Sequence, residues 1–148
     1  MTFYFLESSA LAKLFVEEAG SEQMIALVEP LSQPQKLISG LGVIEVHSAI
    51  RRRQRRGELS PEQAVEALAI LSTESALMTE QPMNATVVET GRQMLDRHAL
   101  RALDAIQLAS CWVVRAMSGI TDIVFVASDQ ALVAAAAAEG FQTWDPAL

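Results

Sequence analysis

The sequence predicts a three-layer α/β/α domain in which helices cover both faces of a mostly parallel sheet. Residues 3–6 and 123–126 are runs of four apolar residues, as expected of short strands that are buried on both faces. Segments with apolar residues at helical spacing alternate with the short apolar runs, which is typical of strands connected by helices. The chain has 148 residues, of which 51% are hydrophobic, so we expect residues 1–148 to form a single domain with a substantial core.

The individual elements follow from apolar spacing and from the residues that start or stop a helix. Strands are expected at residues 3–6, 36–39, 123–126 and 141–144. Helices are expected at residues 9–18, 21–30, 43–56, 60–71, 85–97, 103–117 and 128–138. The pattern does not define how far the fourth helix continues beyond residue 71.

Capping and turn residues support several of these boundaries. Ser60 is followed by proline and, three residues later, by glutamine, which is the pattern of a capping box. Gly57 stands where a helix commonly ends, and Asn84 can cap the helix that follows it. Ser21 is expected to cap the second helix, and Gln33-Pro34-Gln35 predicts a turn.

The composition excludes several classes of protein. No basic segment precedes a long apolar stretch and no apolar run reaches about 18 residues, so neither a signal peptide nor a membrane span is expected. The single cysteine, Cys111, lies in an apolar helical segment and is typical of a reducing compartment, so we expect a cytoplasmic protein. Phosphate-binding glycine loops, a Gly-x-Ser-x-Gly motif and a histidine partner for the cysteine are absent from the sequence, which argues against nucleotide-driven and acyl-transfer chemistry.

Four acidic residues stand in apolar surroundings at the ends of predicted elements. Glu7 ends the first strand, Glu45 lies in the first turn of its helix, Asp104 lies near a helix start, and Asp129 follows the strand at 123–126. Charged side chains are rarely buried unless they are paired or bind a metal. Because ligands of open α/β sheets bind beyond the carboxyl ends of the strands, the four acids are expected to gather there.

A cluster of carboxylates without histidine suits Mg²⁺ or Mn²⁺ better than zinc. Such a site supports metal-assisted hydrolysis of a phosphodiester bond. Taken singly, Asp104 and Asp129 are equally well explained as helix caps or as first-turn charges that complement the helix dipole. The four acids together favour the metal site.

The chain resembles the PIN-domain ribonucleases, and in particular the VapC-type toxins of toxin–antitoxin pairs. The resemblance covers nearly the whole chain and rests on four acidic motifs in the same order and spacing as in that family, together with the arginine-rich stretch and the Gly57–Pro61 segment after it. The motifs are Phe5-Leu6-Glu7-Ser8-Ser9-Ala10-Leu11, Val43-Ile44-Glu45-Val46, Arg101-Ala102-Leu103-Asp104-Ala105 and Phe125-Val126-Ala127-Ser128-Asp129. Each motif alone is weak, but four in order are fairly specific.

The resemblance implies a five-stranded parallel sheet between helices and an endoribonuclease that uses one or two divalent metal ions. Glu45, Asp104 and Asp129 match acids of the family's metal site, and Ser9 matches a hydroxyl that supports it. The resemblance also implies an RNA substrate (tRNA, rRNA or mRNA), a cognate antitoxin protein and a homodimer.

Glu7 departs from the family pattern, which nearly always has aspartate at this position. Glutamate keeps the charge but extends the side chain by about 1.5 Å. A displacement of that size can lower a rate by about 10²-fold, because Mg²⁺ requires near-ideal octahedral geometry. Two hypotheses follow: a nuclease with a weakened or differently tuned metal site, or a PIN-like module that binds RNA or an antitoxin without cutting.

A cationic segment interrupts a chain whose net charge is −7. Five of its 11 basic residues are Arg51, Arg52, Arg53, Arg55 and Arg56. These arginines are expected to contact RNA phosphates or an acidic segment of an antitoxin. The alternative is a solvated helix end whose charges complement the helix dipole.

Overall fold

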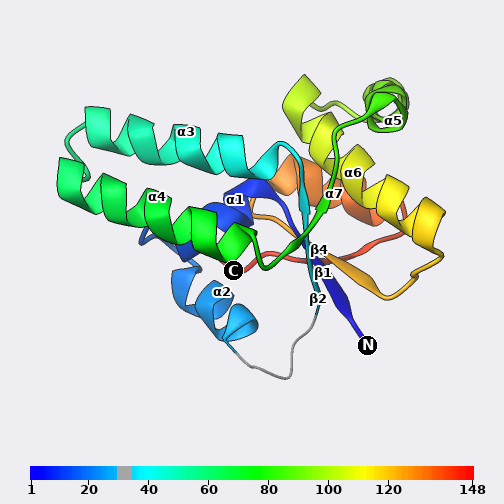
Figure 1. Cartoon of the computed structure of the whole chain (residues 1–148). Coiled ribbons are helices and arrows are strands. Elements are labelled where there is room, and N and C mark those ends of the chain that lie inside the picture. The colour runs from blue at the N-terminus through cyan, green and yellow to red at the C-terminus, as the bar shows by residue number, and fades with distance from the viewer. Residues whose placement is uncertain (30–34) are drawn as a thin grey trace.

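The structure is a computed structural model that describes residues 1–29 and 35–148. Within these residues, five parallel strands form one sheet in the order β3-β2-β1-β4-β5 (Figure 1). The strands are β1 (Phe3–Leu6), β2 (Gln35–Ser39), β3 (Thr79–Gln81), β4 (Ile123–Val126) and β5 (Gln142–Trp144). The helices are α1 (Ser8–Leu11), the 3₁₀ turn η1 (Ala12–Leu14), α2 (Ser21–Val28), α3 (Gly42–Arg55), α4 (Pro61–Ser75), α5 (Ala85–Arg97), α6 (Ala102–Ser118) and α7 (Gln130–Ala138).

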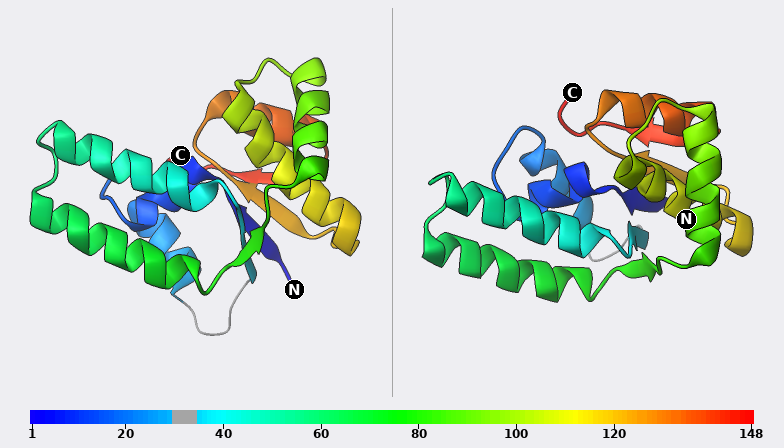
Figure 2. Two further views of the ribbon diagram at one scale, coloured as in Figure 1. Left: turned by 45° about the horizontal axis from the view of Figure 1, so that its top comes forward. Right: turned by 90° about the horizontal axis from the view of Figure 1, so that it is seen from above.

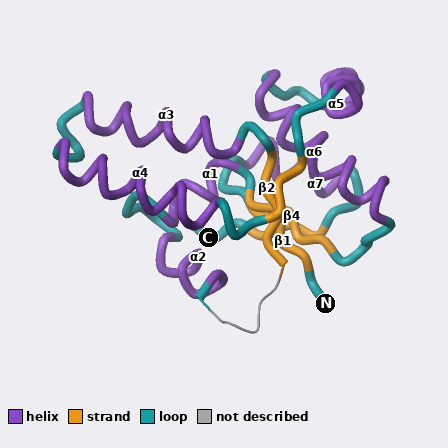
Figure 3. The backbone as a smooth tube through the Cα atoms, in the orientation of Figure 1, coloured by secondary structure: helices purple, strands orange, loops and turns teal. Residues whose placement is uncertain are grey.

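The sheet lies between two helical layers, as the sequence predicted. Helices α1 to α4 cover one face and α5 to α7 cover the other, with the strands gathered between them (Figure 3). Successive residues of each strand enter opposite cores: Phe5 and Phe125 pack toward α5, α6 and α7, whereas Leu6 and Val126 pack toward α1 to α4. The rings of Phe5 and Phe125 stack with their centroids 5.6 Å apart. Burial on both faces explains why these strands are continuous apolar runs.

Helices α3 and α4 form an antiparallel pair that extends away from the sheet (Figure 2). Gly57, with φ of 78°, ends the first of them, as the sequence predicted. Ser60 begins the second with the expected capping box: its Oγ accepts from the Gln63 amide at 3.1 Å, and Gln63 Oε1 accepts from the Ser60 amide at 2.8 Å. The arginine-rich segment therefore lies at the tip of this pair.

The first predicted helix, at residues 9–18, is wrong in extent. The chain forms only α1 and η1 and then turns, because polar side chains stabilise the turn that follows. Lys13 is buried and pairs with Glu18 at 3.2 Å, and Ser21 Oγ accepts a hydrogen bond from the Glu18 amide at 3.0 Å. Ser21 is consequently the first residue of α2 and not its cap; Gly20, with φ of 93°, takes the cap position.

Strand β3 is the element that the sequence did not reveal. It is three residues long, polar and mostly exposed, and among the described strands it pairs with β2 alone, at the edge of the sheet. An edge strand that buries little has no apolar pattern to detect. Of the turn predicted at Gln33-Pro34-Gln35, the first two residues lie outside the described part of the chain, and Gln35 begins β2.

None of the helices in the described ranges is both long and apolar enough to cross a membrane.

The parallel arrangement brings the carboxyl ends of all five strands to one edge of the sheet, called here the carboxyl edge. Glu7 directly follows β1, and Asp129 follows β4, its immediate neighbour. Helix α3 starts at this edge because it follows β2, and α6 starts there because it leads back into β4. Strand β2 lies on one side of β1, and β4 lies on the other. The strand order therefore reverses direction at β1, which makes this part of the edge a topological switch point.

Candidate metal centre at the carboxyl edge of the sheet

The four predicted acids all lie at the carboxyl edge and influence one another electrostatically. The negative charges of Glu45 and Asp104 raise the pKa of Glu7, and the charge of Asp129 raises the pKa of Asp104. These acids come from four separate elements of the chain: the ends of β1 and β4 and the first turns of α3 and α6. The fold thus unites residues that lie more than 100 positions apart in the sequence.

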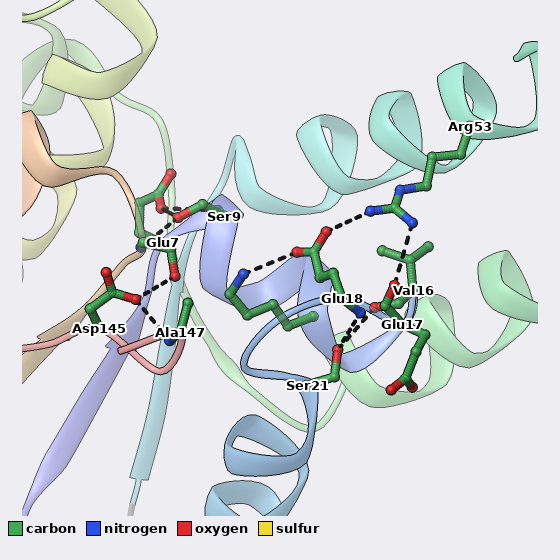
Figure 4. A network of polar contacts seen from close by, with 11 residues as sticks. Glu7, Ser9, Val16, Glu17, Glu18, Ser21, Arg53, Asp145 and Ala147 are labelled. Carbon is green, nitrogen blue, oxygen red and sulfur yellow. Dashed lines mark hydrogen bonds and ion pairs between the residues drawn. The ribbon is translucent and has the colours of Figure 1, made fainter. Parts of the chain in front are cut away.

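Glu7 is the most deeply buried of the four, with 5% of its surface exposed. Its Oε2 accepts hydrogen bonds from the Ser9 hydroxyl and, at 2.9 Å, from the Ser9 amide, so that Glu7 caps α1 (Figure 4). Burial raises the pKa of Glu7 from 4.5 to about 7; the hydrogen bonds from Ser9 oppose this rise, and the charges of Glu45 and Asp104 add to it. Ser9 Oγ also accepts from the Ser128 amide at 2.9 Å, which ties the end of β1 to the end of β4.

Glu45 is held by two donors from other elements. Ser8 Oγ donates to Glu45 Oε1 at 2.8 Å, and Gln107 Nε2 donates to the same oxygen at 2.6 Å. The adjacent hydroxyls of Ser8 and Ser9 therefore serve different acids. Sequence analysis identified Ser9 but missed Ser8 and Gln107. The only signal for Gln107 was a polar residue at an apolar position of α6, one turn after Asp104.

Asp104 and Asp129 each combine a helical role with a place in the cluster. Asp129 Oδ1 accepts from the Leu132 amide at 3.1 Å and caps α7, as one of the two interpretations proposed. Asp104 lies in the first turn of α6 and is not its cap; Arg101 occupies that position and lies 3.5 Å from the Asp104 carboxylate. Partial burial, followed by the charge of Asp129, raises the pKa of Asp104, and the Arg101 charge opposes this.

The cluster has the chemistry of a site for a hard cation. Glu7 is a buried carboxylate with no ion pair to a lysine, arginine or histidine among the described residues. An isolated buried charge is costly, and oxygen ligands of this kind suit Mg²⁺ or Mn²⁺. However, no three Asp, Glu, His or Cys side chains in the described ranges are arranged to hold one ion. Backbone amides engage Oε2 of Glu7 and Oδ1 of Asp129, so each of these carboxylates keeps its other oxygen for an ion.

A fifth acid, Asp145, follows β5 at the same edge. Its Oδ1 accepts from Ser128 Oγ at 2.8 Å and from the Ala147 amide at 2.9 Å (Figure 4). Its Oδ2 accepts from Gln130 Nε2 at 2.7 Å. Both oxygens are thus used to fix the C-terminal turn against the β4–α7 loop. Asp145 is best explained as a structural residue.

The arginines of the cationic segment divide into two groups. Arg53 pairs with Glu18 at 2.7 Å and, with Lys13 on the other side of Glu18, connects α3 to the turn before α2 (Figure 4). Arg51 donates to Gln54 at 2.8 Å on the same helix. The remaining three, Arg52, Arg55 and Arg56, are exposed. Of the five arginines, these three have the solvent exposure that contact with RNA or an antitoxin would need.

An apolar cavity of about 630 Å³ lies elsewhere, between α2, α4 and the start of β2. Phe15, Ile25, Ile70 and Met78 contribute to its lining, and none of the four acids does. The acids therefore belong to an open edge of the sheet and not to this cavity.

The fold and the acids together define an α/β/α domain with an acidic site at the carboxyl edge of a parallel sheet. The chain matches the PIN domain family over residues 4–138 and therefore belongs to that family. This confirms the family predicted from the four acidic motifs. Among curated protein sequences, none matches the chain.

Several solved structures share the fold over nearly the whole chain, among them VapC-type toxins as the sequence resemblance predicted. Mycobacterium tuberculosis VapC20, described as a Sarcin-Ricin loop cleaving toxin, is 23% identical with a TM-score of 0.61, covering 93% of this chain and 95% of its own. VapBC from Salmonella typhimurium bound to DNA is 10% identical with a TM-score of 0.64, covering 99% of each chain. FitAcB from Neisseria gonorrhoeae is 13% identical with a TM-score of 0.66, covering 97% of this chain and 98% of its own.

Proposed function

We propose that this protein is a metal-dependent endoribonuclease, a toxin of the VapC kind. The observation that carries the proposal is the meeting of Glu7, Glu45, Asp104 and Asp129 at the carboxyl edge of a PIN-domain sheet. The similarity in fold to VapC20, a loop-cleaving toxin, supports the same activity class.

The chain's own residues would act by binding and positioning. Glu7, Glu45, Asp104 and Asp129 would hold Mg²⁺ or Mn²⁺, and Ser9 would orient Glu7 through its hydroxyl and amide. When bound, the cation supplies polarisation of a phosphoryl oxygen and a lowered pKa of water, which promote hydrolysis of the RNA backbone. The serine hydroxyl also joins β1 to the β4–α7 loop, so it keeps Glu7 and Asp129 on the same side of the edge.

Glu7 is proposed to weaken the site without abolishing it. Its side chain caps α1 through Oε2, so the cap sets where the carboxylate can present its other oxygen to a cation. Aspartate at the same position would carry its carboxylate about 1.5 Å closer to the backbone. A protein that binds RNA or an antitoxin without cutting remains the competing outcome, and the experiment below separates the two.

The decisive measurement is cleavage of a mixed tRNA, rRNA and mRNA pool by the purified protein in Mn²⁺, in Mg²⁺ and in EDTA. We expect metal-dependent cleavage that the Asp104→Asn protein lacks and that the Glu7→Asp protein performs faster. Asp122→Asn is a matched control, because Asp122 precedes β4 at the opposite end of the sheet. Absence of cleavage by both the native and the Glu7→Asp proteins would refute the nuclease proposal and favour a binding module.

The proposed partners are the RNA substrate, a cognate antitoxin and a second copy of the chain. The similarity to VapBC and FitAcB supports an antitoxin partner. RNA binding is assigned to Arg52, Arg55 and Arg56 at the tip of the α3–α4 pair. Alanine at all three positions should weaken RNA binding and reduce its dependence on salt, because a protein that contacts fewer phosphates releases fewer counterions when it binds. Arg92→Ala on α5, which removes one exposed arginine elsewhere, is the control.

The proposed homodimer is tested by light scattering coupled to size-exclusion chromatography. We expect twice the mass of one chain at micromolar concentration. A single-chain mass at all concentrations would refute the dimer without affecting the nuclease proposal.

A further inference from the structure

Gln107, a buried side chain beside the acids, forms contacts that packing alone does not explain. It lies on α6 one turn after Asp104, with 1% of its surface exposed. Its Nε2 donates to Glu45 Oε1 at 2.6 Å and to Ser8 Oγ at 2.8 Å, and Ser8 Oγ donates to the same Glu45 oxygen at 2.8 Å. The three side chains close a triangle of hydrogen bonds that joins α1, α3 and α6.

The orientation of the Gln107 amide is set by Glu45. An ionised carboxylate only accepts hydrogen bonds, so the amide must turn its nitrogen toward Glu45 and its oxygen away. Gln107 Oε1 is thereby buried without a hydrogen-bond partner among the described residues. Such unpaired groups are rare because they destabilise a fold. A leucine would fill a similar volume without this cost, so stability of the core does not account for glutamine here.

The triangle leaves the second oxygen of Glu45 available. Both hydrogen bonds go to Oε1, and within the described ranges none reaches Oε2. Two donors from different helices restrict the carboxylate to one orientation, which is the arrangement by which outer-shell groups fix metal ligands. Glu45 is therefore held in one orientation while its Oε2 has no hydrogen-bond donor among the described residues.

We propose that Gln107 and Ser8 are positioning residues that fix Glu45 so that its Oε2 is presented to a divalent cation. This inference rests on the proposed function, in which Glu45 is a cation ligand. Helix α6 then contributes twice to the site: Asp104 as a ligand and, one turn later, Gln107 as the group that aligns a ligand on α3. The inference concerns how the cation is held and does not depend on which RNA is cut.

The test is titration calorimetry of Mn²⁺ into the full chain, with unfolding in urea measured on the same samples. Gln107→Leu should weaken Mn²⁺ binding by about 10–100-fold, the usual effect of losing an outer-shell partner, without lowering stability. Ser8→Ala, which removes the other donor to the same oxygen, should also weaken binding. Ser110→Ala is the matched control: Ser110 is a buried hydroxyl one turn further along α6 that bonds Ile106 O and Ser39 Oγ and contacts no acid.

A second comparison separates positioning from a general structural effect. In a Glu45→Ala background, Gln107→Leu should cause no further loss of Mn²⁺ affinity, because the group it aligns is gone. An equal loss in both backgrounds, or unchanged affinity in Gln107→Leu, would overturn the inference. Should Gln107→Leu fail to fold, Ser8→Ala is judged by the same two criteria.

The proposed function is tested separately by the native protein. Native protein that neither binds Mn²⁺ nor cuts RNA would overturn the proposed function and this inference with it. Native protein that does both, with Gln107→Leu and Ser8→Ala indistinguishable from it, would overturn this inference alone.

Discussion

The burial of Glu7 predicts an unusual dependence of stability on pH. Its pKa is raised from 4.5 to about 7 in the folded protein, mainly by burial. An acid whose pKa is raised by folding stabilises the fold fully below the unfolded value, and the contribution is lost as pH rises toward the folded value. The window is therefore from about pH 4.5 to about pH 7. One pKa unit corresponds to about 1.4 kcal/mol, so the loss across this window is about 3 kcal/mol.

Glu7→Gln is the perturbation that isolates this effect. The amide is close in shape to the protonated acid and its oxygen can still accept from the Ser9 amide, but it does not ionise. We expect the free energy of unfolding of the native protein to fall by about 3 kcal/mol relative to the variant between pH 4.5 and pH 8. The other acids titrate in both proteins, so most of their effect cancels when the free energies of unfolding of the native and Glu7→Gln proteins are subtracted.

The assay is urea unfolding of both proteins at several pH values in EDTA, followed by circular dichroism. Adding Mn²⁺ at pH 8 should restore stability to the native protein and not to Glu7→Gln, because a cation stabilises the ionised carboxylate. Parallel stability profiles in EDTA, within about 0.5 kcal/mol from pH 4.5 to pH 8, would refute the assignment of a buried, hard-to-ionise carboxylate.

Three further predictions concern contacts around the site and the scaffold. Ser9→Ala should destabilise the protein by about 1–3 kcal/mol and raise the pKa of Glu7, because Glu7 loses its hydroxyl donor; urea unfolding measures the first and a pH profile of stability the second. Arg53→Met should lower stability by about 1 kcal/mol and leave RNA affinity unchanged, because Arg53 pairs with Glu18; unfolding and gel-shift titrations test this. Glu139 pairs with Arg97, which lowers its pKa, so its stabilisation is present above about pH 4.5 and is lost as pH falls. The stability difference between native and Glu139→Gln proteins should therefore shrink in acid, and a constant difference would contradict it.

The sequence predicted those parts of the structure in which burial and local chemistry agree. Strands β1 and β4 are apolar because both faces of the sheet are covered, so an uninterrupted apolar run identifies them. The capping box at Ser60 likewise predicts the start of α4 at the residue where the structure has it. The four acids were recognisable because charges at element ends inside apolar runs conflict with burial unless they share a function.

The parts that the sequence did not predict depend on contacts between distant residues. The end of the first helix is determined by Glu18, which pairs with Lys13 behind it and with Arg53 on α3. A helical pattern gives no sign of such a pairing. The same applies to Gln107, whose partners come from two other helices, and to Arg53, which is one of five similar arginines until its acidic partner is located.

Glu7 has two roles, as the cap of α1 and as a proposed cation ligand, and both depend on the position of its carboxylate. As a cap, Glu7 directs Oε2 at the Ser9 amide and hydroxyl, and as a ligand it would offer Oε1 to the cation. Aspartate, a preferred capping residue, would make the same bond with its carboxylate about 1.5 Å nearer the backbone. Burial is the main cause of the raised pKa of Glu7, and the charges of Glu45 and Asp104 add to it; a cation bound beside these carboxylates would offset both effects. Metal binding and deprotonation of Glu7 are therefore coupled, and the affinity for Mn²⁺ should increase as pH rises through about 7.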